Sequence, residues 1–253
     1  MIIEEQFSTG ESFVHKLDPR IKIIVATLYS IVVAVSSNFS ALLPALGISV
    51  FLTVLGKLSI RKVLYRLLLV NGLIIFLWVF LPFTYKGETL FTIGPLAGTK
   101  EGVLYASQIT IKCNAILLAM IALLSTTPIS TLGHAMGQLY FPDKIIHLFL
   151  FTYRYIYVIF QEYNRLINAM RIRGFKPQTN LHTYRSYAYL VGMLLVRSYD
   201  RAERIHKAML CRGFHGKYYT LSRFSIKIGD ILYLSLMLSA ILGLMVLQWR
   251  VIV

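Results

Sequence analysis

Two short segments in the second half of the chain place a guanidinium group next to a glycine and an aromatic ring. Residues 169–175 read Ala-Met-Arg-Ile-Arg-Gly-Phe and residues 208–214 read Ala-Met-Leu-Cys-Arg-Gly-Phe, so that five of the seven positions are identical. A guanidinium group is planar and donates several hydrogen bonds in a fixed geometry, which suits a carboxylate or carbonyl group in a groove of another protein. The repeat therefore predicts attachment to a partner protein, and we assign no catalytic residue.

Each copy of the repeat is predicted to end a long helix. The first helix would run over 143–173, after Pro142, and the second over 185–212. Gly174 and Gly213 then stand just past the last turn, where a left-handed residue closes a helix. Arginine near a helix end also complements the helix dipole, so one copy alone is explained by capping. Capping requires only the glycine, however, and the recurrence of alanine, methionine and phenylalanine at the same spacing favours a function.

The predicted contact residues follow from the two copies. Five of them would touch the partner: Arg171, Arg173, Gly174, Arg212 and Gly213. Six more would support the contact from the preceding turns: Arg165, Ala169, Met170, Arg204, Ala208 and Met209. The alanines are small and allow close approach of another helix. Two tips of one kind suggest two docking sites on a partner with two-fold or pseudo-two-fold symmetry.

The composition of the whole chain predicts a membrane protein. Of 253 residues, 57% are hydrophobic and 15% are charged, whereas charged residues make up about a quarter of an average soluble domain. The apolar residues form five blocks close to the length of a membrane-spanning helix: 23–37, 39–56, 67–83, 109–125 and 231–249. We predict an all-α polytopic membrane bundle of about five spans, to which the two long helices are attached. Two distant cysteines predict no disulfide framework.

Polar groups inside the spans are few. Asn71 lies within the third block and Lys112 near the start of the fourth. We expect structural roles for both, with Asn71 hydrogen-bonded between helices and Lys112 extended toward an interface. No secretory signal is expected, because the first twenty residues lack an apolar core, and the first span would direct insertion.

The distribution of charge predicts the topology. The net charge is +15, from 26 Lys and Arg against 11 Asp and Glu. Basic residues precede the first span and separate the second from the third, whereas the connection between the first and second has no charge. The glycine-rich connection 84–107 carries few basic residues, which predicts that it lies outside the cell. The amino terminus would then be cytoplasmic and the carboxyl terminus external. The same bias places 127–229 on the cytoplasmic side, because it holds 15 basic and four acidic residues.

Three domains follow from this topology: an N-terminal membrane domain of four spans (1–126), a cytoplasmic helical domain (127–229) and a C-terminal span (230–253). The apolar stretches 145–160 and 187–196 would lie along the membrane interface or pack under the spans. The alternative is that both stretches span the membrane, which would place the intervening arginines outside.

Several motifs resemble one transporter family over nearly the whole chain. They are Leu-Asp-Pro-Arg-Ile-Lys at 17–22, Thr-Pro-Ile at 127–129, Tyr-Arg-Tyr-Ile at 153–156, and Arg-Ala-Glu-Arg at 201–204 leading into the second repeat. The chain resembles the CbiQ/EcfT family, the transmembrane T subunits of energy-coupling-factor transporters. The run 201–216 is most similar to the cobalt-transport branch, and nickel and vitamin transporters use similar subunits. Where the family has Ala-Arg-Gly at the helix ends, this chain has Ile or Cys before Arg-Gly.

The resemblance implies a role in a bacterial cell membrane. Two ATP-binding-cassette subunits would hold the two tips in their grooves, and the two long helices, as coupling helices, would pass their movement to a substrate-binding membrane (S) subunit. The chain itself would bind no cofactor, because ATP belongs to the ATPase subunits, and it has no Gly-x-x-x-x-Gly-Lys-Ser/Thr phosphate-binding loop. The six histidines are scattered, so no metal site is predicted, and nucleic acid is not an expected partner.

Two other classes of function remain as alternatives. A membrane-embedded enzyme would use the arginines to bind a phosphorylated substrate, but the cytoplasmic segment offers only four carboxylates without an Asp-x-x-Asp pattern: Asp143, Glu162, Asp200 and Glu203. A channel or independent carrier would need a polar lining across the membrane, and the predicted spans are almost entirely apolar.

Overall fold

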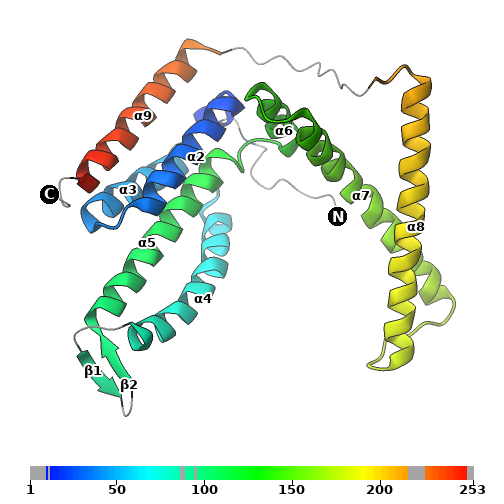
Figure 1. Cartoon of the computed structure of the whole chain (residues 1–253), viewed down its shortest axis with the longest axis horizontal. Helices are drawn as coiled ribbons and strands as arrows, with labels where there is room; N and C mark the ends of the chain where they lie inside the picture. The colour runs from blue at the N-terminus through cyan, green and yellow to red at the C-terminus, as the bar shows by residue number, and fades with distance from the viewer. Residues whose placement is uncertain (1–9, 11, 86–88, 94–95, 216–225, 250–253) are drawn as a thin grey trace. The chain divides into compact units, whose positions relative to one another are not determined.

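The computed structural model describes residues 10, 12–85, 89–93, 96–215 and 226–249 (Figure 1). Its helices confirm the predicted all-α class, with one small two-stranded sheet among the described residues. The chain divides into two compact units. One contains Met136–Arg223 and the other Glu5–Ala135 together with Phe224–Val253. The predicted boundaries at 126 and 229 concern the position of the membrane and stay a prediction.

The larger unit contains most of the elements. They are α1 (Phe13–Lys16), α2 (Pro19–Val35), α3 (Phe39–Leu55), α4 (Ile60–Thr84), β1 (Thr89–Ile93), β2 (Leu96–Thr99), α5 (Lys100–Leu123) and α9 (Ile228–Trp249). The strands pair antiparallel, with Ile93 opposite Leu96. Helix α6 (Ile129–Gln138) lies where the two units meet in the sequence, and the smaller unit contains α7 (Asp143–Ile172) and α8 (Leu181–Cys211).

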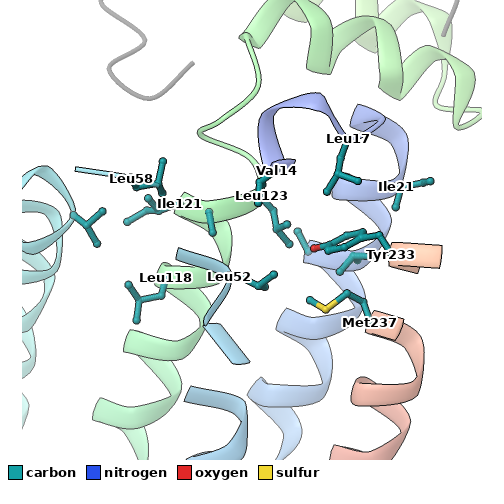
Figure 2. Packing of buried hydrophobic residues seen from close by; sticks show 14 residues of the cluster. Val14, Leu17, Ile21, Leu52, Leu58, Leu118, Ile121, Leu123, Tyr233 and Met237 are labelled. Atoms are coloured by element: carbon teal, nitrogen blue, oxygen red, sulfur yellow. The ribbon is translucent and has the colours of Figure 1, made fainter. Parts of the chain in front are cut away.

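Helix α5 is the centre of the larger unit, since it packs against α2, α3 and α4, while α9 packs against α2 and α3. Two groups of buried apolar side chains fill the space between these helices. Figure 2 shows one of them, where Leu17 and Ile21 of the α1–α2 region lie near Leu123 of α5 and near Tyr233 and Met237 of α9. Because α9 follows the smaller unit in the sequence, this core needs both ends of the chain.

Three of the five predicted spans are long and apolar enough to cross a membrane: α4, α5 and α9. Helix α3 is apolar but has 17 residues, or about 25 Å at 1.5 Å per residue, against a hydrocarbon core of about 30 Å. Helix α2 also has 17 residues and carries Arg20 and Lys22 in its first turns. Neither α7 nor α8 is among the candidate spans of the described chain, and their predicted position outside the bilayer stays a prediction.

The predicted loop 84–107 is wrong in part, because α5 begins at Lys100. Gly102, interpreted as a loop residue, lies in the first turn of that helix, and a Cβ atom there would come within 2.8 Å of the Pro82 backbone. The glycine thus permits a close approach of α4 and α5. Thr99 caps α5 by accepting a hydrogen bond from the Gly102 amide at 3.3 Å, and its hydroxyl lies 2.9 Å from the Tyr85 carbonyl oxygen.

The polar residues of the spans have structural partners. Asn71 of α4 and Asn114 of α5 exchange two hydrogen bonds, each of 3.1 Å, which confirms the predicted interhelical role of Asn71. Lys112 lies in the middle of α5 and not near its start, and its ammonium group donates to the Ala34 carbonyl at 3.0 Å. That carbonyl belongs to the last turn of α2, where the helix dipole attracts a cation.

The Asn71–Asn114 pair gives a first stability prediction. Replacing Asn71 with Leu removes both hydrogen bonds and leaves the Asn114 amide without them. We expect a loss of about 1 kcal/mol, in the range measured for interhelical hydrogen bonds in membranes, read from unfolding of the purified chain by SDS. The double variant N71L/N114L should lose less than the sum of the single variants, and strict additivity would contradict a direct interaction.

Candidate functional site

The two Arg-Gly segments form the same helix cap. Gly174 has a φ of 82° and Gly213 a φ of 78°, which confirms the predicted left-handed glycines. At the first cap the Phe175 amide donates to the Met170 carbonyl at 3.1 Å and the Gly174 amide to the Arg171 carbonyl at 3.0 Å. The second cap repeats these two bonds with the same lengths, from Phe214 to Met209 and from Gly213 to Leu210. This pair of bonds defines a Schellman motif.

The motif explains more of the repeat than the sequence interpretation allowed. Methionine is the third residue from the end of each helix, and phenylalanine follows the left-handed glycine. A hydrophobic contact between these two positions frequently accompanies a Schellman motif. The methionine and phenylalanine side chains are half-buried in both copies. Methionine and phenylalanine thus occupy positions that a Schellman motif commonly uses, in addition to the glycine. Alanine and the capping arginine are the repeated residues that the cap does not require.

The predicted contact residues are exposed at both helix ends. In each copy the arginine, the glycine and the alanine are exposed: Ala169, Arg173, Gly174, Ala208, Arg212 and Gly213. Arg171, Arg165 and Arg204 are exposed as well. Arg173 and Arg212 are the C-cap residues of α7 and α8. The structure thus presents two matching surfaces, each with a guanidinium group at a rigid helix end.

The end of α7 is tied to the start of α8. The Phe175 ring lies 5.8 Å from the Tyr187 ring in an edge-to-face arrangement and 6.4 Å from the His182 ring. Helix α8 begins at Leu181, four residues earlier than predicted, because the Asn180 side chain accepts a hydrogen bond from the Thr183 amide at 2.8 Å. Asparagine is among the strongest N-cap residues, and this local signal could have been used to place the helix start.

This connection separates the two tips. Since the α7 tip lies beside the start of α8, the distance to the other tip is set by the length of α8 (Figure 1). Its 31 residues span about 46 Å at 1.5 Å per residue. The sequence interpretation did not give this separation. The two arginines therefore serve two separate binding sites and not a single pocket.

The left-handed glycines predict a local effect of substitution. A Cβ atom at position 174 or 213 meets no atom within 4 Å, so only the backbone opposes Gly174→Ala or Gly213→Ala. The left-handed conformation costs a non-glycine residue roughly 1–2 kcal/mol, and we expect hydrogen exchange at the Phe175 or Phe214 amide to rise about 5- to 30-fold. Gly192→Ala, in the middle of α8, is the control and should not accelerate exchange. Unchanged exchange at both caps would contradict the assignment.

Two of the four carboxylates of the smaller unit, Glu162 and Glu203, are held in ion pairs. Glu162 binds Arg197 and Arg165, and Glu203 binds Lys207 at 2.7 Å, one turn along α8. Among the residues that the structure describes, no three histidine, cysteine or acidic side chains gather as metal ligands would. The prediction that this chain binds no metal or cofactor stays a prediction. His182, one of the six histidines, packs on Phe175.

A buried polar cluster that the sequence did not predict lies in the larger unit. Asp18 caps α2, accepting from the Arg20 amide at 2.9 Å and pairing with the Arg20 guanidinium at 2.9 Å. The Asp18 amide donates to the Asp230 carboxylate at 3.1 Å. Lys22 is fully buried and donates to the hydroxyl groups of Thr127 at 2.8 Å and Thr126 at 3.4 Å.

This cluster joins the start of α2, the end of α5 and the start of α9. It gives a structural reason for the motifs at 17–22 and 127–129, because their polar side chains bind one another. Asp230 is 5% exposed and also accepts from the Lys227 amide at 3.0 Å.

Comparison with known proteins agrees with these motifs and with the membrane helices. The family model described as "Cobalt transport protein" (CbiQ) matches residues 10–221. The chain belongs to this family. It is a membrane protein of the CbiQ/EcfT family, the T components of energy-coupling-factor transporters. The matched range includes Asp18, Lys22 and Thr127 of the buried cluster, helices α7 and α8, and both tips.

Individual proteins that match the chain are distant in sequence but are covered over most of their length. The energy-coupling factor transporter transmembrane protein EcfT of Brevibacillus brevis is 28% identical over 222 residues, which cover 83% of this chain and 84% of that protein. The protein of the same name from Bacillus subtilis is 27% identical over 229 residues, with 83% and 84% covered. An uncharacterised protein of Methanocaldococcus jannaschii is 24% identical over 251 residues, with 96% and 86% covered.

Proposed function

We propose that this chain couples two ATP-binding-cassette ATPase subunits to a substrate-binding S subunit in an importer of the energy-coupling-factor class. Helices α7 and α8 are the coupling helices, and Arg173 and Arg212 enter a groove on each ATPase subunit. ATP binding and hydrolysis take place in the ATPase subunits, and this chain is not an enzyme.

The observation that carries the proposal is the duplication of one exposed, capped arginine tip at two places about 46 Å apart. A single small ligand cannot reach both tips. Two copies of one fold, or two related folds, bring two matching grooves to such a distance. A guanidinium group at a rigid helix end loses little side-chain freedom when it donates to carboxylates or carbonyls in a groove.

Cobalt is the substrate that we propose for the whole transporter. The matching family model is described as a cobalt transport protein, and the run 201–216 resembles the cobalt-transport branch of the family. Nickel and vitamin importers use T subunits of the same kind, so the S subunit carries the choice of substrate. The metal ion is cargo, and its ligands belong to the S subunit.

The proposed location is the bacterial cell membrane, with the amino terminus and the coupling helices in the cytoplasm and the carboxyl terminus outside. The positive-inside rule supports this orientation, because basic residues gather at the start of α2, from the end of α3 into the first turns of α4, and along α7 and α8. The lipid bilayer would surround the exposed apolar faces of α4 and α9.

The proposal is tested by isolating the tagged chain from its native membrane in a mild detergent. We expect two ATPase subunits and one small membrane protein to accompany it, and the reconstituted complex to take up radioactive cobalt with ATP. Competition by nickel or by a vitamin would reassign the substrate without changing the coupling role. Recovery of a stable chain without any ATPase subunit would overturn the proposal and favour the membrane-enzyme alternative.

A further inference from the structure

Helices α7 and α8 cross where their apolar packing is incomplete. A hollow of about 570 Å³ opens between them, and most of its wall is apolar. Its apolar lining includes Val158, Ile159, Leu194, Leu195 and Ile205. Well-packed helices interlock side chains and leave few voids larger than a water molecule. An open hollow at the crossing means that side-chain packing alone does not determine the angle between these two helices.

One polar contact bridges the helices at this hollow. The Glu162 carboxylate of α7 accepts a hydrogen bond from the Arg197 guanidinium of α8, and it also pairs with Arg165 of its own helix at 3.5 Å. The Glu162 side chain is 12% exposed and the Arg197 side chain 49% exposed. The pairs Asp18–Arg20 and Glu203–Lys207, by contrast, join residues two and four positions apart.

The Glu162 carboxylate is surrounded by positively charged arginine side chains. The hydrogen bond from Arg197, and then the positive charges of Arg197, Arg165 and Arg201, hold the pKa of Glu162 below its ordinary value. The carboxylate therefore stays ionised at neutral pH. Without it, Arg165 on α7 would face Arg197 and Arg201 on α8 with no negative charge between them, and like charges repel.

The Glu162–Arg197 contact lies far enough from both tips that a small change in crossing angle would displace them. Arg173 lies 11 residues beyond Glu162, and Arg212 lies 15 residues beyond Arg197. At 1.5 Å per residue these are arms of about 16 Å and 22 Å. A change of about 10° in the crossing angle would therefore move the α8 tip by about 4 Å relative to α7.

We propose that the Glu162–Arg197 ion pair fixes the crossing of α7 and α8 and thereby sets the position of the α8 tip relative to α7. Glu162 and Arg197 are positioning residues, and neither is required to touch a partner. The inference rests on the proposed function only in that the tips are the parts used by the ATPase subunits. The crossing itself is measurable in this chain alone.

The test is a distance measurement by pulsed electron paramagnetic resonance on the full chain in lipid nanodiscs. One nitroxide is attached to the native, exposed Cys211 and another to a cysteine replacing the exposed Lys176, with Cys113→Ser removing the remaining cysteine. The variants are E162R, R197E and the charge-exchanged E162R/R197E. The matched control is E203R, which breaks an ion pair within α8.

We expect one narrow distance distribution for the unchanged chain and for E203R. E162R and R197E should each broaden the distribution or shift its mean, by up to about 4 Å for a change of about 10° in crossing angle, and the charge-exchanged variant should return it toward the original. In the assembled transporter, the charge-exchanged variant should transport at least about five-fold faster than either single variant. Unchanged distances in both single variants, or no recovery in the exchanged one, would overturn the proposal.

The two proposals fail in different ways. If the tips do not engage ATPase subunits, reversing Arg173 and Arg212 leaves transport unchanged while the distances still respond to E162R. If the ion pair does not set the crossing, the distances between the labels do not change in E162R, while the tip variants still abolish transport.

Discussion

Reversing both tip arginines, R173E/R212E, is expected to lower ATP-driven transport by at least about 100-fold while the chain still inserts and folds. Both side chains are exposed C-cap residues, so the reversal removes no core contact. Losing one partner of a desolvated, hydrogen-bonded charge pair costs about 2–5 kcal/mol. Transport is measured with the reconstituted complex, and retention of ATPase subunits is measured by their recovery with the tagged chain.

Each single reversal should account for about half of the effect on a logarithmic scale, because sites about 46 Å apart act independently. The control is K144E/R185E, which changes the net charge by the same amount at two exposed positions, one on α7 and one on α8. Transport by R173E/R212E at the level of this control would show that the tips do not couple the ATPase subunits to the membrane.

Asp230→Ala is expected to lower the stability of the larger unit by about 3 kcal/mol. The Asp230 carboxylate accepts hydrogen bonds from the amides of Asp18 and Lys227, and hydrogen bonds to a charged group contribute about 1.5–3 kcal/mol each. Its removal also leaves the buried Lys22 with less negative charge nearby, which is costly in a desolvated position. For a chain of this size the midpoint of thermal unfolding should fall by about 6–12 °C.

The measurement is thermal unfolding of the purified chain in detergent, followed by circular dichroism. Asp230→Asn keeps one acceptor and should lose less, and Asp200→Ala, on an exposed face of α8, should change stability by less than about 0.5 kcal/mol. A midpoint for Asp230→Ala equal to that of the Asp200 control would mean that the cluster does not hold α2 and α9 together.

The sequence predicted those features that depend on neighbouring residues. The glycine caps are an example, because all their hydrogen bonds lie within six consecutive residues around Gly174 and Gly213. The apolar blocks predicted α4, α5 and α9, since hydrophobic length is a property of composition. The family was recognisable from motifs at 17–22 and 201–204, which were identified without knowing what their side chains touch.

Gly102 and Lys112 were placed incorrectly, and their contacts lie far away in the sequence. Gly102 was assigned to a loop, because glycine is common in loops, and the α4 backbone that requires it is distant in sequence. Lys112 was placed near the start of a span because the apolar block begins at residue 109, whereas α5 begins at Lys100. Its partner, the Ala34 carbonyl, is 78 residues away in sequence and could not be predicted locally. Asn71 was interpreted correctly because an uncharged amide inside a span has few options other than another helix.

What the sequence alone determined is the class of the protein, its membrane helices and the identity of the two tips. Tertiary structure decided the separation of the tips, the Glu162–Arg197 bridge and the Asp18–Asp230 cluster. The physical reason is sequence distance: the bridge joins residues 35 positions apart and the Asp18–Asp230 hydrogen bond residues 212 positions apart. Composition and spacing say which groups can pair, and only the packing of α2 with α9 and of α7 with α8 decides which of them meet.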